Sequence, residues 1–144
     1  MMKSANCKRG LWSAIVAGIV IYVVMGVANA GILGSEWQAW KTATASVNHS
    51  MPENTALWIW FAQSLILGVV GMWLYISVRP NWGPGPWTAF KIATALWLAS
   101  YVPGFMDSIA LGTVSWNIAI INWIGGAVAL VAAMWAGGWW YKEA

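Results

Sequence analysis

The sequence predicts an all-α membrane protein with four transmembrane helices and both termini in the cytoplasm. Two observations lead to this prediction. Sixty per cent of the 144 residues are apolar and only 8% are charged, whereas a soluble domain devotes about a quarter of its residues to charge. The apolar residues also fall in four long runs with polar connections between them. So few charged groups cannot cover a surface that faces water, and the outside of this chain must therefore face lipid or other protein.

A bilayer core of about 30 Å takes roughly 20 apolar residues in a helix, and four segments reach that length. They are residues 11–34, 56–78, 88–111 and 114–141, which together with an outer loop at 35–55 make a single domain over 1–144. Each segment should be helical, because hydrocarbon offers no partner to an unpaired backbone amide.

The first segment has an alternative interpretation. Basic residues before an apolar run, and the small residues Ala28-Asn29-Ala30 after it, are typical of a cleavable signal peptide. The run is longer than such a peptide needs, however, and it contains Trp12 and Tyr22. We therefore expect a retained first helix.

The third segment contains Pro103-Gly104. Because proline removes a helical hydrogen bond and clashes with the preceding turn, we expect the helix to kink there. The kink would expose backbone carbonyl groups close to the polar side chains of the outer half of the bilayer.

The fourth segment carries small residues at a spacing of four: Gly125, Ala129, Ala133 and Gly137. Such a stripe lets two helix backbones approach closely. Gly68 and Gly71, with Ser64, would offer a matching surface on the second segment. We expect the stripe to pack within the chain, and contact with another subunit is the alternative.

The basic residues orient the bundle. Six of the seven fall on one side of the predicted topology, and Lys41 alone falls on the other. Under the positive-inside rule the richer side is the cytoplasm. The Trp residues favour the same arrangement, because most of them flank the segments at the depth that indole rings prefer. The six residues on the cytoplasmic side are Lys3, Lys8, Arg9, Arg79, Lys91 and Lys142.

Similar segment ends suggest an internal repeat. Asn29 is followed by Leu33-Gly34 at the spacing at which Asp107 is followed by Leu111-Gly112, and the second and fourth segments both end with Trp-x-Tyr. This pattern predicts two repeated helical hairpins, related by an axis along the membrane normal.

Apart from small hydroxyl side chains, the polar residues that we consider within the predicted spans all belong to the outer half of the bilayer. They are Asn29, Gln63, Asp107, Asn117 and Asn122. An ionisable residue at depth is costly and marks a functional site by default, so Asp107 leads this candidate cluster as a proton carrier, a cation ligand or a hydrogen-bonding centre. The alternative is structural: Asp107 lies near enough to the interface to be hydrated and to orient the end of its helix.

Several chemistries are disfavoured by the residue content. The single histidine, His49, cannot supply two axial haem ligands, and no cluster of Cys, His and carboxylate residues has zinc spacing. No Ser-His-Asp set, phosphate loop or dinucleotide-binding glycine pattern appears. We therefore expect no catalytic residue, no metal, no cofactor and no enzymatic activity, while a bound lipid or pigment stays open. The basic residues lie at helix ends rather than on one patch, which argues against nucleic acid as a partner.

The connection between the second and third segments reads Arg79-Pro80-Asn81-Trp82-Gly83-Pro84-Gly85-Pro86-Trp87-Thr88-Ala89. It resembles the loop of a group of bacterial four-helix inner-membrane proteins, in which Arg-Pro, a Gly-Pro-Gly turn and Thr-Ala follow a helix that ends with Tyr. Asn29, Leu33-Gly34 and Trp37 fit the same group, as does the closing Gly138 to Tyr141. The resemblance implies a multi-pass protein of the bacterial inner membrane and assigns no activity. The high Trp content departs from that group and suggests contacts with protein or pigment as well as lipid.

Two functions fit these features. The first is a structural or accessory subunit of a larger bacterial membrane complex, with membrane lipids and other membrane subunits as partners of its Trp-rich and small-residue helix faces. The second is a small transporter or binder of a lipid or small apolar molecule, using the polar cluster around Asp107. Contacts with lipid or partner would involve Arg79 and Lys91 at the inner interface, and Trp97 and Trp123 deeper in the membrane.

Overall fold

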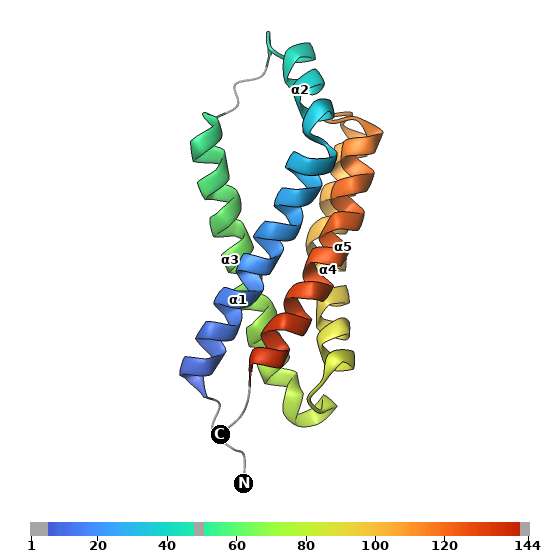
Figure 1. Ribbon diagram of the computed structural model, residues 1–144. Helices are drawn as coiled ribbons and strands as arrows, with labels where there is room; N and C mark the ends of the chain where they lie inside the picture. Colours follow the sequence, from blue (N-terminus) through green and yellow to red (C-terminus); the bar gives the residue numbers. More distant parts are fainter. Residues whose placement is uncertain (1–5, 48–50, 142–144) are drawn as a thin grey trace.

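The computed structural model describes residues 6–47 and 51–141, and this part of the chain is helical and contains no strand. Figure 1 shows the long helices running lengthwise through the molecule, with the short helix α2 at one end. Lys3, His49 and Lys142 lie outside the described residues. The elements in chain order are α1 (Cys7–Gly26), the π-helical segment η1 (Val27–Ile32), α2 (Gly34–Ala43), α3 (Glu53–Trp82), α4 (Pro86–Ala110) and α5 (Trp116–Trp140).

Three of the described helical segments are long and apolar enough to cross a membrane, not the four that the sequence predicts. They are Cys7–Ile32, Glu53–Trp82 and Trp116–Trp140. The helix that does not meet this requirement is α4, although its length of 25 residues equals that of α5. Lys91 and Asp107 leave only residues 92–106 between them uncharged, which is shorter than the roughly 20 apolar residues that a spanning helix needs. The all-helical fold is confirmed, and the three suitable helices are compatible with a multi-pass membrane protein.

One segment prediction needs correction. Residues 35–55 do not form a simple loop, because α2 occupies their first part. Pro103, where a kink is predicted, does not end its helix, since α4 continues through this proline as far as Ala110. A helix can contain proline where its neighbours or side chains satisfy the freed backbone groups.

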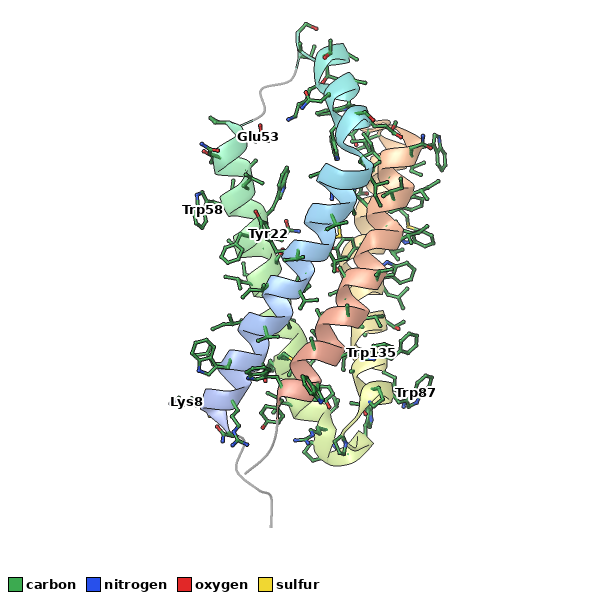
Figure 2. All side chains as sticks on the ribbon, viewed as in Figure 1. Lys8, Tyr22, Glu53, Trp58, Trp87 and Trp135 are labelled. Carbon is green, nitrogen blue, oxygen red and sulfur yellow. The ribbon has the colours of Figure 1, made fainter. Side chains whose placement is uncertain are left out.

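The two ends of the bundle differ in charge. We call the end where α1 begins the inner end and the opposite one the outer end. Figure 2 shows Lys8 and Trp87 at the inner end and Glu53 at the outer end. Arg79 and Lys91 belong to the inner end through the turn that joins α3 to α4, whereas Lys41 is in the last turn of α2 at the outer end.

The turn between α3 and α4 is built on backbone conformations that favour glycine. Gly83 and Gly85 have φ angles of +79° and +131°, where a side chain would strain the backbone. The hydroxyl of Thr88 donates a hydrogen bond to the Gly83 carbonyl over 2.8 Å, and the Gly85 amide donates to the Tyr75 hydroxyl over 3.2 Å. These bonds fix the geometry with which α4 leaves α3.

The helix α1 lies at the centre of the packing. It makes extensive contacts with both α3 and α5, while α5 packs equally closely on α4. The backbones of α1 and α3 come closest at Gly18 and Gly68, because a Cβ atom added to Gly68 would lie 2.5 Å from the amide nitrogen of Gly18. Such an approach is open only to residues without a side chain, and it increases dispersion contacts between helices in lipid.

The predicted small-residue stripe of α5 also faces α1. Ala129 and Ala133 are fully buried. A Cβ atom added to Gly137 would lie 3.1 Å from the Ser13 carbonyl oxygen of α1 and 2.6 Å from the Met72 sulfur of α3, and one added to Gly125 would lie 3.5 Å from the Ala28 Cβ of η1. The stripe therefore packs within the chain. The sequence predicts that Gly68 and Gly71 of α3 pack on this stripe. Gly68 instead faces α1, whereas Gly71 lies against Met134 of α5.

The predicted hairpins are present as the packed pairs α1–α3 and α4–α5. A repeat about an axis along the membrane normal requires the α1–α5 and α3–α4 contacts to match. The first interface is extensive and the second is small. The π-helical segment after α1 also has no counterpart at the end of α4. The similarity of the segment ends therefore does not extend to a symmetric arrangement of the two hairpins.

Candidate functional site

The polar residues at the outer end form a connected network around Asn29. The Nδ2 of Asn29 donates to the Met25 carbonyl over 2.9 Å and to the Oδ1 of Asn122 over 3.0 Å. Its Oδ1 accepts a hydrogen bond from the Trp37 indole over 2.9 Å. Asn122 in turn donates to the Ile118 carbonyl on its own helix. Both amides are half-buried, and every hydrogen of the Asn29 amide group has an acceptor.

The π-helical segment η1 explains how Asn29 joins this network. A π-helical turn is wider than an α-helical turn and is frequent at functional positions. Here it covers Val27 to Ile32 and ends where the Leu33 amide donates to the Ala28 carbonyl over 3.1 Å. The chain then enters α2, which brings the Trp37 indole back onto Asn29.

A second group of hydrogen bonds attaches α2 to the turn between α4 and α5. The carboxylate of Glu36 accepts from the Asn117 amide over 3.2 Å and from the Ser115 hydroxyl over 3.3 Å. The Trp40 indole donates to the Thr113 carbonyl over 2.9 Å. The Trp37 and Trp40 rings meet edge to face at 5.6 Å. We call this whole arrangement the outer cap, formed by Asn29, Glu36, Trp37, Trp40, Thr113, Ser115, Asn117 and Asn122.

Three of the five predicted cluster residues belong to the outer cap, and two do not. Asn29, Asn117 and Asn122 are brought together there. Gln63 and Asp107 are exposed, and neither makes a side-chain hydrogen bond with the described part of the chain. Sequence reasoning placed these two residues at a similar depth but could not give the side of the bundle that each one faces.

Glu36, Trp37 and Trp40 were missed as site residues because their segment was predicted to be a loop. Their spacing carried a usable signal. In a helix, residues 36, 37 and 40 share one face, and an acidic residue near the beginning of a helix is stabilised by the helix dipole. Treating residues 34–43 as a helix would have aimed all three side chains in one direction.

The deep pair predicted for lipid or partner contact packs internally. The Trp97 and Trp123 rings lie 5.0 Å apart, and the Trp97 indole donates to the Trp123 carbonyl over 2.9 Å. The Phe105 ring stacks on the Trp123 ring, with 5.2 Å between the ring centres. These contacts join α4 to α5, so both indoles are only partly available to lipid.

At the inner end, the predicted contact residues Arg79 and Lys91 sit over aromatic rings. The Arg79 guanidinium lies 5.2 Å from the centre of the Tyr141 ring, and the Lys91 ammonium lies 5.1 Å from Trp82 and 5.7 Å from Trp87. Such cation–π contacts hold basic side chains at an interface. Arg79 also lines a groove of about 480 Å³ together with Tyr75, Pro84, Gly85, Pro86, Ala89, Trp135, Gly138 and Trp139.

The polar and aromatic side chains of these regions bond to and pack on one another. Within residues 6–47 and 51–141, no three His, Cys, Asp or Glu side chains are grouped so that they could hold a metal ion. The carboxylate of the outer cap is occupied by two neutral donors, which position α2. The outer cap as a whole attaches α2 to the turn between α4 and α5 and to the beginning of α5.

Comparison with protein-family models, curated proteins and solved structures gave no match. The resemblance carried by residues 79–89 therefore stays a prediction, and the function has to be argued from the geometry of this chain.

Proposed function

We propose that the chain is a structural or accessory subunit of a larger membrane assembly and that a partner helix packs on α3. One observation carries this proposal. A seam of exposed side chains follows α3 at alternating spacings of four and three residues: Ile59, Gln63, Ile66, Val70 and Trp73. This is the 3.5-residue period with which two long helices wind around each other. The seam lies away from α1, which α3 meets through Ser64 and Gly68.

Gln63 distinguishes this seam from a surface made only for lipid. It lies about 15 Å along α3 from Glu53, given a rise of 1.5 Å per residue, and is exposed among apolar neighbours. An amide in hydrocarbon without a partner is costly, and polar side chains of this kind join helices in membranes. A single polar residue in such a seam also fixes the register of two helices. A partner with a donor or acceptor opposite Gln63 would satisfy both requirements.

The outer cap supports the same class of function. Its side chains are used to hold elements of the chain together, which is what a scaffold needs. We also propose that α4 is the fourth spanning helix, because it packs along α5 and its charged residues, Lys91 and Asp107, lie toward its two ends. The basic inner end then faces the cytoplasm, and a bacterial inner membrane is the membrane we propose.

The assembly can be tested by replacing Val70 with Trp and measuring the mass of the complex extracted in a mild detergent. The measured mass of the wild-type complex should correspond to this chain together with at least one further protein chain. Val70→Trp should dissociate that chain because the bulky ring separates the two helices. Val128→Trp is the matched control, since Val128 is an exposed valine on α5. A wild-type protein that carries only lipid, or equal effects of both substitutions, would contradict the proposal.

The topology has its own test. In cells, a membrane-impermeant thiol reagent applied from outside should leave Cys7, the single cysteine and exposed at the inner end, unlabelled. A Thr113→Cys variant in a Cys7→Ser background should react, because Thr113 lies in the turn beyond the outer end of α4. The proposal places three crossings, by α1, α3 and α4, between the two positions. Labelling of both positions from the same side would mean that one or all three of these helices do not cross the membrane.

A further inference from the structure

The structure assigns a lipid site to the outer halves of α3 and α4, and we propose that it takes an outer-leaflet phospholipid with an amine headgroup, held by Asp107. This inference goes beyond the assembly proposed above and uses different surfaces. It begins from the point where α3 and α4 meet. A Cβ atom added to Gly71 of α3 would lie 3.0 Å from Leu96 of α4, so the two helices touch there.

From this contact the two helices separate toward the outer end. Residues on the Leu96 face of α4 follow at the helical spacing of four, seven and eleven, which gives Ser100, Pro103 and Asp107. Leu96 is 7% exposed, whereas all three of the others are exposed. On α3, the corresponding face leads from Gly71 through half-buried Leu67 to Trp60, which is 54% exposed. Ser64, at the edge of this face, is buried against Gly18 of α1. In Figure 1 the outer end of α3 lies on the opposite side of α1 from α4.

The side chains near this region agree with the separation. Tyr22 of α1 meets Phe61 of α3 edge to face at 5.3 Å, and Trp58 meets Phe61 at 6.1 Å. Figure 2 shows Tyr22 between α1 and α3 and Trp58 on the side of α3 that faces away from the bundle. The contact between α3 and the rest of the bundle thus passes through α1 on this half, and the faces of α3 and α4 are left apart.

The length of these faces selects a lipid over a protein helix. From Leu96 to Asp107 the helix rises about 16 Å, at 1.5 Å per residue, which is close to half of a hydrocarbon core of about 30 Å. The two helices are in contact at Leu96, and at the inner end they are joined by the short turn at Gly83 and Gly85. A transmembrane helix between them would need to pass both this contact and the turn. A lipid of the outer leaflet would not, because its acyl chains end near the middle of the bilayer.

The polar groups on the α4 face select the headgroup. The Asp107 carboxylate is exposed one turn from the outer end of α4, and no described residue forms an ion pair with it. Pro103 has no N–H to give to the Ala99 carbonyl, so this oxygen also lacks its helical donor. A face that offers only acceptors and negative charge fits an ammonium group and repels an anionic lipid.

Phosphatidylethanolamine has the required headgroup, and phosphatidylcholine and phosphatidylglycerol are matched competitors. Choline carries the same charge without an N–H donor, and phosphatidylglycerol carries a net negative charge. The protein would be reconstituted into nanodiscs that contain the three lipids in equal amounts, and the lipids that stay bound would be weighed by native mass spectrometry. We expect phosphatidylethanolamine to be retained over phosphatidylcholine by about tenfold, the ratio that one charge-assisted hydrogen bond supplies.

Four variants locate the site. Asp107→Asn should abolish the preference, and Asp107→Glu should keep it, which guards against a variant that merely misfolds. Ser108→Ala is the neighbouring control, because the Ser108 hydroxyl is already bonded to the Gly104 carbonyl at 2.7 Å. Ser100→Phe should fill the space between the faces and release the lipid whatever its headgroup.

Each outcome decides the proposal. Equal retention of the three lipids by the wild type would overturn it, and so would a preference that survives Asp107→Asn. Discovery of a second protein chain in place of the lipid, displaced by Ser100→Phe, would overturn it in favour of a helix in this position. Dissociation of a partner by Val70→Trp with the lipid preference intact would leave both proposals standing.

Discussion

The Nδ2 atom of Asn29 lies 3.0 Å from the Oδ1 atom of Asn122, although 93 positions separate the two residues in the chain. This bond joins the end of the first spanning segment to the beginning of the last helix. It also makes the outer cap continuous, because the same Asn29 amide receives the Trp37 indole.

Removing this bond should weaken the bundle by a measurable coupling energy. We expect a double-mutant cycle of Asn29→Ala and Asn122→Ala to give about 0.6 kcal/mol, the average for hydrogen bonds between helices in membranes, and no more than the maximum of about 1.7 kcal/mol. The free energy of unfolding would be measured by denaturant titration in a mild detergent. The pair Gln63→Ala and Asn122→Ala provides the control cycle, and it should show additive effects because Gln63 makes no contact with the cap.

Gly68→Ala should destabilise the packing of α1 on α3 by about 1–3 kcal/mol, as overpacking generally does. The added methyl group would meet the backbone of Ala14 and Gly18 at 2.5 Å, and backbone atoms cannot rotate aside. Gly26→Ala is the matched control, because nothing lies within 4 Å of the position that its Cβ atom would take. That variant should be neutral or more stable by up to about 1 kcal/mol. Equal losses in both variants would contradict the close crossing at Gly68.

Trp40→Phe should release α2 without unfolding the bundle. The substitution keeps an aromatic ring and removes the donor that reaches the Thr113 carbonyl. Hydrogen exchange followed by mass spectrometry should then show faster exchange over residues 34–43 and unchanged exchange over the centre of α1. Trp58→Phe is the control, since the Trp58 side chain is 72% exposed. Protection of α2 that does not change in Trp40→Phe would mean that the bond contributes nothing to the attachment.

Gly83→Ala should cost about 1–3 kcal/mol through backbone strain alone. The position has a φ of +79° and a ψ of +161°, a conformation that is essentially restricted to glycine, and its Cβ atom would meet nothing within 4 Å. Gly104→Ala, in an open helical position, should cost nothing. Thermal unfolding followed by circular dichroism separates the two, and a loss in Gly104→Ala as large as in Gly83→Ala would contradict a strain effect.

The sequence predicted the helices well because apolar length is a local property. The three helices that are long and apolar enough to cross a membrane could be located from composition alone, and Ala129 and Ala133 of the small-residue stripe are buried within the chain. The partner of that stripe was not predictable in the same way. Small residues of both α3 and α5 pack against α1. The spacing of small residues along a helix does not indicate which neighbouring helix they contact.

The candidate site was harder to predict, because it depends on direction around a helix. Asn29, Asp107 and Asn122 fall at similar depths, yet Asp107 points along the face of Leu96 while the two asparagines meet each other. A π-helical turn rotates the side chains that follow it around the helix axis. The residue types of Val27 to Ile32 do not predict such a turn. The network through Glu36 was missed for a simpler reason, since a ten-residue polar helix carries no membrane signal.

The central position of α1 has a consequence for the order of assembly during synthesis. About 90 residues separate the end of α1 from the beginning of α5, which at 5–20 residues per second corresponds to roughly 5–18 s of translation. During that interval α1 can pair with α3 through Gly18, but its Ser13 and Ala17 side has no α5 to cover it. The first hairpin therefore forms with half of its eventual interface uncovered, and that side of α1 stays exposed to its surroundings until α5 has been synthesised.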